Sequence, residues 1–357
     1  MPQTKNHFLV LDAARGLAAL AVFLFHIKVF VFKDTSIGAT EIFSKSYLAV
    51  DLFFLMSGLV IARSYGDKLL SLSMTFTDFV KIRILRLYPL YFAGLILGVF
   101  YLIFRWIIKH EDPFDAYNLA RGLALNSLFI PDFFNKDGLF IFNPAAWSLS
   151  LEWIINVIYA ALAVKIASRS LFFITACSGA ILLYLGIDAG TIDLGWSSET
   201  FFGGIIRIVF SFTLGVLIYK KMADWNLKIK ISPYILLSLL LLCLMMPIGT
   251  HTVYYDFICV FLIFPLFMYF ACYSETPSSM NKPFFLIGQT SYALYILHTP
   301  LIMWMGGAWK MFTGTEPNDF PVSSFLSMSF GIILISFFAA ILFDEPIRKI
   351  IRNNFFR

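Results

Sequence analysis

Long apolar stretches separated by short polar segments dominate the pattern of residues along this chain. A membrane-spanning helix needs roughly 20 predominantly apolar residues. Strict alternation of apolar and polar residues, which is typical of a transmembrane β-barrel, is weak here. The pattern therefore predicts an all-α, polytopic integral membrane protein with about ten transmembrane helices. We expect these helices at residues 8–32, 47–65, 84–108, 145–165, 170–187, 201–219, 232–248, 252–273, 284–308 and 324–345.

The positive charges of the polar segments predict the orientation of these helices, because cytoplasmic loops carry an excess of Lys and Arg. If the N-terminus is cytoplasmic, the inside segments hold sixteen such residues: Lys5, Lys68, Lys81, Arg83, Arg86, Lys165, Arg169, Lys220, Lys221, Lys228, Lys230, Lys282, Arg348, Lys349, Arg352 and Arg357. The outside segments hold six: Lys33, Lys45, Lys109, Arg121, Lys136 and Lys310. This bias favours both termini in the cytoplasm.

Composition agrees with a membrane protein, since 59% of the residues are apolar and 14% are charged, against about 25% charged in soluble domains. The net charge of +5 follows from the loop bias, so we expect membrane lipid and no nucleic acid as a partner. The first apolar stretch is too long for a signal peptide and is read as a retained helix. With no linker rich in Gly or Ser, residues 1–357 are expected to form one membrane domain without an appended soluble domain.

Two ionisable residues of the first predicted helix share one face. Arg15 and His26 are eleven residues apart, a rotation about 20° beyond three full turns and a rise of roughly 16 Å. Ionisable groups are costly inside a bilayer and often mark function. This spacing suits a path that begins with an anion near the cytoplasm and ends with chemistry deeper in the membrane. The alternatives are an interfacial arginine and a packed, hydrogen-bonded core histidine.

A pair of arginines follows the second predicted helix, in a segment assigned to the cytoplasmic loop. Arg83 and Arg86 are three residues apart, so on a helix they lie side by side. Paired guanidinium groups match phosphate oxygens well. The alternative is that they are ordinary charges of a cytoplasmic loop.

Three further polar residues lie toward the predicted outer ends of helices. Asp51 is expected near the depth of His26, where a carboxylate orients an imidazole, or else it is a simple helix-start residue. Glu152 lies among aromatic residues and is a candidate acid or base, or a partner of a sugar hydroxyl or of an arginine, for which Arg207 is a candidate. His298 lies in the outer half of the ninth helix.

The longest predicted outer loop, residues 109–144, contains aromatic residues, Asn and Asp. It is either a lid that contacts a sugar or an ordered connector. The 5 histidines and 4 cysteines are too dispersed for a known metal motif, so no metal is expected.

Six segments of the chain together resemble the acyltransferase-3 family of bacterial membrane O-acyltransferases. They occur in the same order along nearly the whole chain, and one departure is Ala14, where the family often has Leu. The matching segments are Leu11–His26, with an arginine and a histidine separated by ten residues, Asp51–Gly58, Arg83–Pro89, Trp147–Glu152, Ser291–His298, and Glu345 with Pro346.

The resemblance implies ten core helices in the inner (plasma) membrane of a bacterium. It implies acyl-CoA, by default acetyl-CoA, as co-substrate, and a glycan or lipid-linked sugar as acceptor. We expect Arg15, Arg83 and Arg86 to bind acyl-CoA. Catalysis is assigned to His26, Asp51 and Glu152, with His26 as general base or as a transiently acylated nucleophile. Substrate binding is assigned to Trp147, Ser150, Tyr292 and His298.

The competing interpretation is a membrane transporter or flippase of a glycan or small anion, since intramembrane charges also line transport pathways. The two halves of the chain show no repeated hydropathy pattern. Dependence on acyl-CoA separates the two interpretations, because a transporter does not require it.

Overall fold

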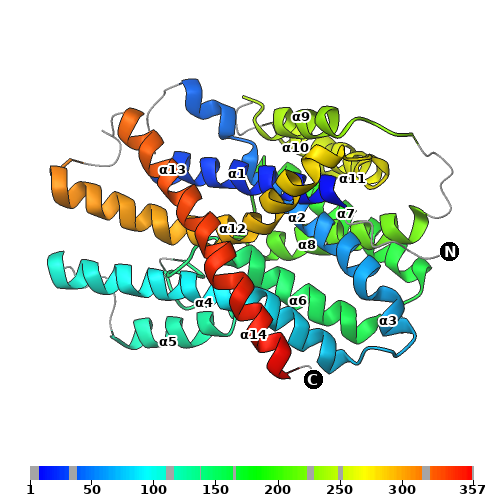
Figure 1. The fold of residues 1–357 in the computed structure, drawn as a ribbon, viewed down its shortest axis with the longest axis horizontal. Helices are drawn as coiled ribbons and strands as arrows, with labels where there is room; N and C mark the ends of the chain where they lie inside the picture. The colour runs from blue at the N-terminus through cyan, green and yellow to red at the C-terminus, as the bar shows by residue number, and fades with distance from the viewer. Residues whose placement is uncertain are drawn as a thin grey trace.

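The computed structural model describes residues 8–31, 38–109, 116–136, 138–163, 166–222, 229–247, 252–315 and 322–355, and these residues contain helices and no strand. Of the residues used to predict orientation, Lys5, Lys33, Lys165, Lys228 and Arg357 lie outside the described part. Most of the long helices run roughly along one axis of the molecule, while α13 and α14 cross the front diagonally (Figure 1). The predicted all-α class is confirmed.

Every predicted apolar range overlaps a helix of the structure. The main helices are α1 (Leu9–Val31), α2 (Ala49–Ile61), α3 (Asp67–Leu70), α4 (Phe76–Lys109), α5 (Ala116–Ser127), α6 (Ala146–Leu162), α7 (Ser168–Ala189), α8 (Phe201–Met222), α9 (Pro233–Leu244), α10 (Val253–Ile258), α11 (Phe264–Tyr273), α12 (Asn281–Thr313), α13 (Val322–Phe338) and α14 (Glu345–Phe355). Short π-helical segments join α2 to α3, α10 to α11 and α13 to α14.

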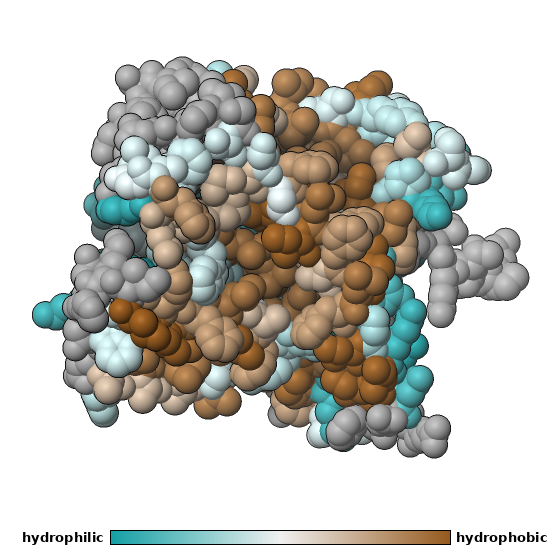
Figure 2. Space-filling view, turned by 60° about the vertical axis from the view of Figure 1, so that its left-hand side comes forward, coloured by the Kyte–Doolittle hydropathy of each residue, from teal (hydrophilic) through white to brown (hydrophobic). Residues whose placement is uncertain are grey.

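Within the described residues, 7 helical segments are long and apolar enough to cross a membrane, and α6 and α9 are shorter apolar helices. The visible face carries a broad apolar band across its middle, with hydrophilic residues gathered toward opposite sides (Figure 2). Large apolar side chains exposed on the molecule include Phe100, Phe172, Phe173, Phe330 and Leu342. Such an extensive apolar surface is typical of a protein surrounded by lipid. The chain is therefore a multi-pass membrane protein, while the count of ten and the sidedness stay predictions.

Helix α4 begins eight residues before the predicted start at residue 84, at Phe76. The Oγ1 atom of Thr75 accepts from the backbone N–H of Asp78 at 3.1 Å, and the Asp78 carboxylate accepts from the Thr75 hydroxyl at 2.7 Å. This reciprocal capping stabilises the first turn. Arg83 and Arg86 therefore lie side by side on a helix, as their spacing indicates, and the assignment of this segment to a loop is wrong.

The described part of the predicted outer loop 109–144 is an ordered connector that contains α5. Asn126, Asp132 and Phe142 are buried in it, and Arg121 forms an ion pair with Asp132 at 3.1 Å. None of these residues lines the larger cavity described below. Residues 110–115 and Asp137, which belong to the same predicted loop, lie outside the described residues.

Helices α1 and α12 form the most extensive helix–helix contact of the molecule and run side by side (Figure 1). Glycines permit this closeness, as in other membrane helix pairs. A Cβ atom on Gly16 would lie 2.9 Å from the backbone oxygen of Ile287, and one on Gly288 would lie 2.4 Å from the Cβ of Asp12. This contact positions the residues described next.

Candidate active site

Two histidines from α1 and α12 meet inside the molecule. The Nε2 atom of His298 lies 3.1 Å from the Nδ1 atom of His26, and the ring centroids are 4.8 Å apart. His298 is fully buried. His26, a candidate catalytic residue of the first predicted helix, thus has a specific partner on the ninth.

Backbone carbonyls on both helices define which ring nitrogens carry protons. The Nδ1 atom of His26 lies 2.9 Å from the oxygen of Val22, and the Nδ1 atom of His298 lies 3.0 Å from the oxygen of Leu294. A carbonyl oxygen only accepts, so we assign a proton to Nδ1 in both neutral rings. His26 then shares its Nδ1 proton between Val22 and His298, and its Nε2 atom carries the lone pair that a general base uses.

A large cavity of about 1220 Å³ opens among α1, α2, α3, α4, α6, α8, α12 and α14. It exceeds the roughly 300–1,000 Å³ of most small-molecule pockets. Several predicted site residues line it: Arg15, Arg83, Arg86, Glu152 and Tyr292. The cavity therefore brings together the arginines that were predicted to bind an anion, although they come from two different helices.

Arg83 is the most buried of these arginines, and one of its donors is unused. Its Nη2 atom donates to Oε1 of Glu152 at 3.1 Å, and Oε1 also accepts from the Ser57 hydroxyl at 2.8 Å. The Nε atom of Arg83 is buried without a hydrogen-bond partner in the described structure. An unsatisfied buried donor is costly. This guanidinium group is therefore suited to donate a hydrogen bond to an anionic ligand in the cavity.

The other cations of the cavity are more accessible. Arg15 lies 3.4 Å from Asp12, and its side chain is 23% exposed. Arg86 is half-buried on α4, one helical turn from Arg83. Helix α14 adds its own cations to the same cavity: Arg348, Lys349 and Arg352. A long, phosphate-bearing ligand would find several guanidinium groups here.

One part of the cavity wall lies next to the histidine pair. Phe53, Ser148 and Tyr295 line it, and the ring of Tyr295 is centred 6.0 Å from that of His298. Sequence analysis missed Ser148 and Tyr295 as site residues. A signal existed, because Ser148 lies inside the segment Trp147–Glu152 and Tyr295 lies one turn before His298 on the same helix.

Asp51 does not contact His26, contrary to prediction. Its two carboxylate oxygens accept from Nε and Nη2 of Arg207 at 3.1 and 2.7 Å, and both side chains are fully buried. This bidentate pair joins α2 to α8 and satisfies both charges. The predicted partnership of Arg207 with Glu152 is wrong for the same reason.

Trp147 and Ser150 are both buried away from the cavity. Trp147 packs beneath the guanidinium carbon of Arg207, 5.7 Å from its ring centroid. The Ser150 hydroxyl donates to the backbone oxygen of Phe129 at 2.6 Å. In this structure both residues stabilise the fold, and their assignment to substrate binding is not supported by their positions.

Of the predicted substrate-binding residues, Tyr292 lines the cavity, where its hydroxyl donates to the backbone oxygen of Leu87 at 2.5 Å. His298 lies against His26 instead, and neither histidine is among the residues that line the cavity.

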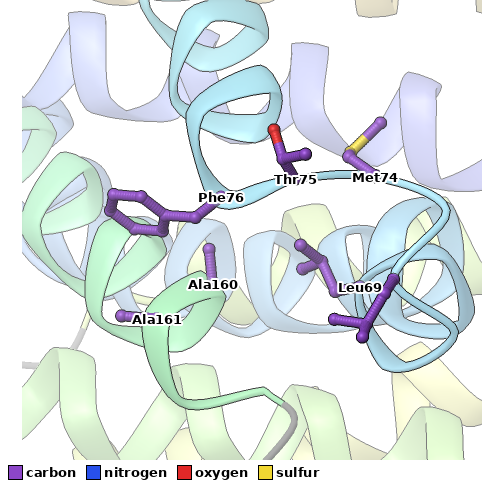
Figure 3. A pocket seen from close by; sticks show the side chains of 7 residues that line it. Leu69, Met74, Thr75, Phe76, Ala160 and Ala161 are labelled. Atoms are coloured by element: carbon purple, nitrogen blue, oxygen red, sulfur yellow. The ribbon is translucent and has the colours of Figure 1, made fainter.

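A second cavity of about 470 Å³ lies between α6 and the turn that joins α3 to α4 (Figure 3). Its lining is mostly apolar and comprises Leu69, Leu72, Met74, Thr75, Phe76, Ala160 and Ala161. None of these residues ionises, so this cavity offers no group for acid–base or anion chemistry.

The fold and the larger cavity define a multi-pass helical membrane protein with a cationic cavity, whose lining residue Tyr295 lies beside the His26–His298 pair. A family model described as an acyltransferase domain matches residues 8–343. The chain therefore belongs to the acyltransferase-3 family, as its motifs indicate.

Two curated relatives are similar over parts of the chain. "Protein 2 in picA locus" of Rhizobium radiobacter is 35% identical over 188 residues, which cover 50% of this chain and 94% of that protein. "Acyltransferase MdmB" of Streptomyces mycarofaciens is 32% identical over 158 residues, or 43% of this chain and 38% of that protein. No solved structure matches.

Proposed function

We propose that this protein is an O-acyltransferase of the bacterial inner membrane. It transfers an acyl group, by default acetyl, from cytoplasmic acyl-CoA to a hydroxyl of a cell-envelope or exported polysaccharide. Membership of the acyltransferase family supports the class of reaction. The observation that carries the donor assignment is the cavity, which joins an arginine cluster to the neighbourhood of the His26–His298 pair.

The arginines account for recognition of the donor. Coenzyme A carries a pyrophosphate and a 3′-phosphate, and guanidinium groups bind such oxygens in paired hydrogen bonds. Arg83 supplies a buried donor without a partner in the described structure, and Arg15 and Arg86 line the same cavity. With the phosphates held there, the pantetheine arm extends along α1 toward Tyr295.

The histidine pair accounts for the chemistry. The Nε2 atom of His26 accepts the proton of the acceptor hydroxyl as its oxygen attacks the thioester carbonyl. The carbon–sulfur bond breaks, and His26 returns the proton to the departing thiolate, so the products are an ester and free CoA. His298 accepts from Nδ1 of His26, which holds the base in the required tautomer and stabilises its protonated form.

Membrane vesicles of defined orientation test the donor assignment. Labelled acetyl-CoA added to inside-out vesicles, which expose the cytoplasmic face, is expected to label a glycan acceptor. The same donor added to sealed right-side-out vesicles is expected to give no label, because acetyl-CoA does not cross the bilayer.

The controls are vesicles from cells that lack the protein. Equal labelling with and without the protein would reject the acyltransferase assignment. Glycan movement that is independent of acetyl-CoA would instead identify a transporter. Labelling only of right-side-out vesicles would reverse the predicted orientation.

A further inference from the structure

We propose that the hydroxyl groups of Ser148 and Tyr295 form the site that binds the thioester carbonyl oxygen and stabilises its negative charge during acyl transfer. This inference rests on the proposed function and adds a catalytic group to it. The two side chains come from α6 and α12 and meet in the wall of the cavity.

Their position places them between the donor and the base. Both residues line the cavity that holds the arginines. Tyr295 lies one turn before His298 on α12, and its ring is centred 6.0 Å from that of the histidine. Phe53 packs edge-on against the ring of Tyr295, with the ring centroids 5.3 Å apart. A thioester that enters from the arginine end reaches these hydroxyls where it also approaches the histidine pair.

One of the two hydroxyl protons of this pair has only a long hydrogen bond. The Oγ atom of Ser148 lies 2.5 Å from the Oη atom of Tyr295, so one hydroxyl proton lies between them. Among the described residues, the remaining proton reaches only the backbone oxygen of Ala145, at 3.3 Å from Ser148 or 3.5 Å from Tyr295. Good O–H···O bonds measure about 2.5–3.0 Å. A carbonyl oxygen in the cavity would therefore be a better acceptor for this proton.

The start of helix α6 favours negative charge at this point. Helix α6 begins at Ala146, so Ser148 belongs to its first turn, where the partial positive charge of the helix dipole is concentrated. When a hydroxyl attacks the thioester, the carbonyl oxygen becomes an oxyanion. Donors that are already oriented toward that oxygen stabilise it more than the neutral carbonyl, which lowers the barrier.

The direct test compares Tyr295→Phe, which keeps the ring, with wild type in the vesicle assay. We expect kcat to fall about 10²–10³-fold, as for the loss of one oxyanion donor, with KM for acetyl-CoA unchanged. Ser148→Ala is also expected to lower kcat and to leave KM for acetyl-CoA unchanged. The double variant is expected to have a kcat only slightly below that of the less active single variant, because the two hydroxyls act as a unit.

The matched control is Tyr91→Phe. Tyr91 is also buried, and its hydroxyl donates to the backbone oxygen of Asn126, but it does not line the cavity. Its kcat is expected to stay at the wild-type value.

Wild-type kcat in Tyr295→Phe would overturn the inference while leaving the acyltransferase assignment intact, whereas an inactive wild type would remove the assignment itself. If Tyr295→Phe does not accumulate in the membrane, Ser148→Ala decides, and wild-type kcat in that variant overturns the inference.

Discussion

At the scale of single residues, the proposed chemistry rests on ionisable side chains that come from different helices. His26, His298 and Arg15 stand out because ionisable groups are rare in apolar stretches. Helical spacing also predicted that the two α4 arginines lie together. Contacts between helices that are distant in sequence follow from packing, so periodicity within one helix did not reveal the pairing of His26 with His298.

The acidic residues illustrate the same limit. Asp51 and Glu152 were each interpreted as catalytic, yet the structure pairs Asp51 with Arg207 and Glu152 with Arg83. Depth along a helix pointed to His26 as the partner of Asp51 and to Arg207 as a partner of Glu152. Only the rotation of each helix about its axis decides among them, and that rotation depends on how all the helices pack.

Removal of one cavity arginine tests the donor site. In Arg86→Ala we expect KM for acetyl-CoA to rise about tenfold, equivalent to roughly 1.4 kcal/mol, with little change in kcat. The reason is that phosphate binding contributes equally to the ground state and the transition state. Acetyl-pantetheine, which lacks the phosphates of CoA, is expected to be used equally by the variant and by wild type.

The control for this prediction is Lys81→Ala, which removes an exposed positive charge from the same helix but outside the cavity. An equal rise in KM for both variants would show that general surface charge, not a phosphate contact, attracts the donor.

At the scale of helices, apolar length located the main elements, and local capping set details that hydropathy misses. The capping pair Thr75 and Asp78 starts α4 in a polar segment, so a hydropathy criterion placed its start too late. Helix α5 was not predicted because the segment is short and mixed in polarity. Glycines are the less obvious determinant, since Gly16 and Gly288 let α1 and α12 approach closely enough for the histidines to touch.

Gly16→Ala tests whether that approach supports activity. The added Cβ would lie 2.9 Å from the backbone oxygen of Ile287, so α1 and α12 must separate. We expect a stability loss of about 1–3 kcal/mol from overpacking. We also expect kcat to fall by up to about 10²-fold, because displacements near 1 Å are costly in active sites. Thermal unfolding in detergent and the vesicle assay measure the two effects.

Gly331→Ala on α13 is the matched control, because its Cβ would meet nothing within 4 Å. This variant is expected to be as stable and active as wild type. If Gly16→Ala behaved in the same way, close approach of α1 and α12 would not be needed for catalysis.

At the scale of the whole molecule, the larger cavity and the charge bias agree. The cavity is lined by several cations from the set predicted to face the cytoplasm: Lys68, Arg83, Arg86, Arg348, Lys349 and Arg352. No described cation of the set predicted to face outward lines it. Under the predicted orientation the cavity therefore opens where acyl-CoA is made. Helix class and family followed from the sequence, whereas a cavity lined by residues of eight helices required the fold.

The most direct test of the central claim is acetyl transfer in inside-out vesicles by wild type and by His26→Ala, with His26→Gln as a variant that keeps more of the side-chain volume. If His26 is the general base, both variants lose about 10²–10⁴-fold in kcat while acetyl-CoA binding and membrane levels stay normal. Wild-type transfer by His26→Ala at normal membrane levels would contradict a catalytic role for the histidine pair.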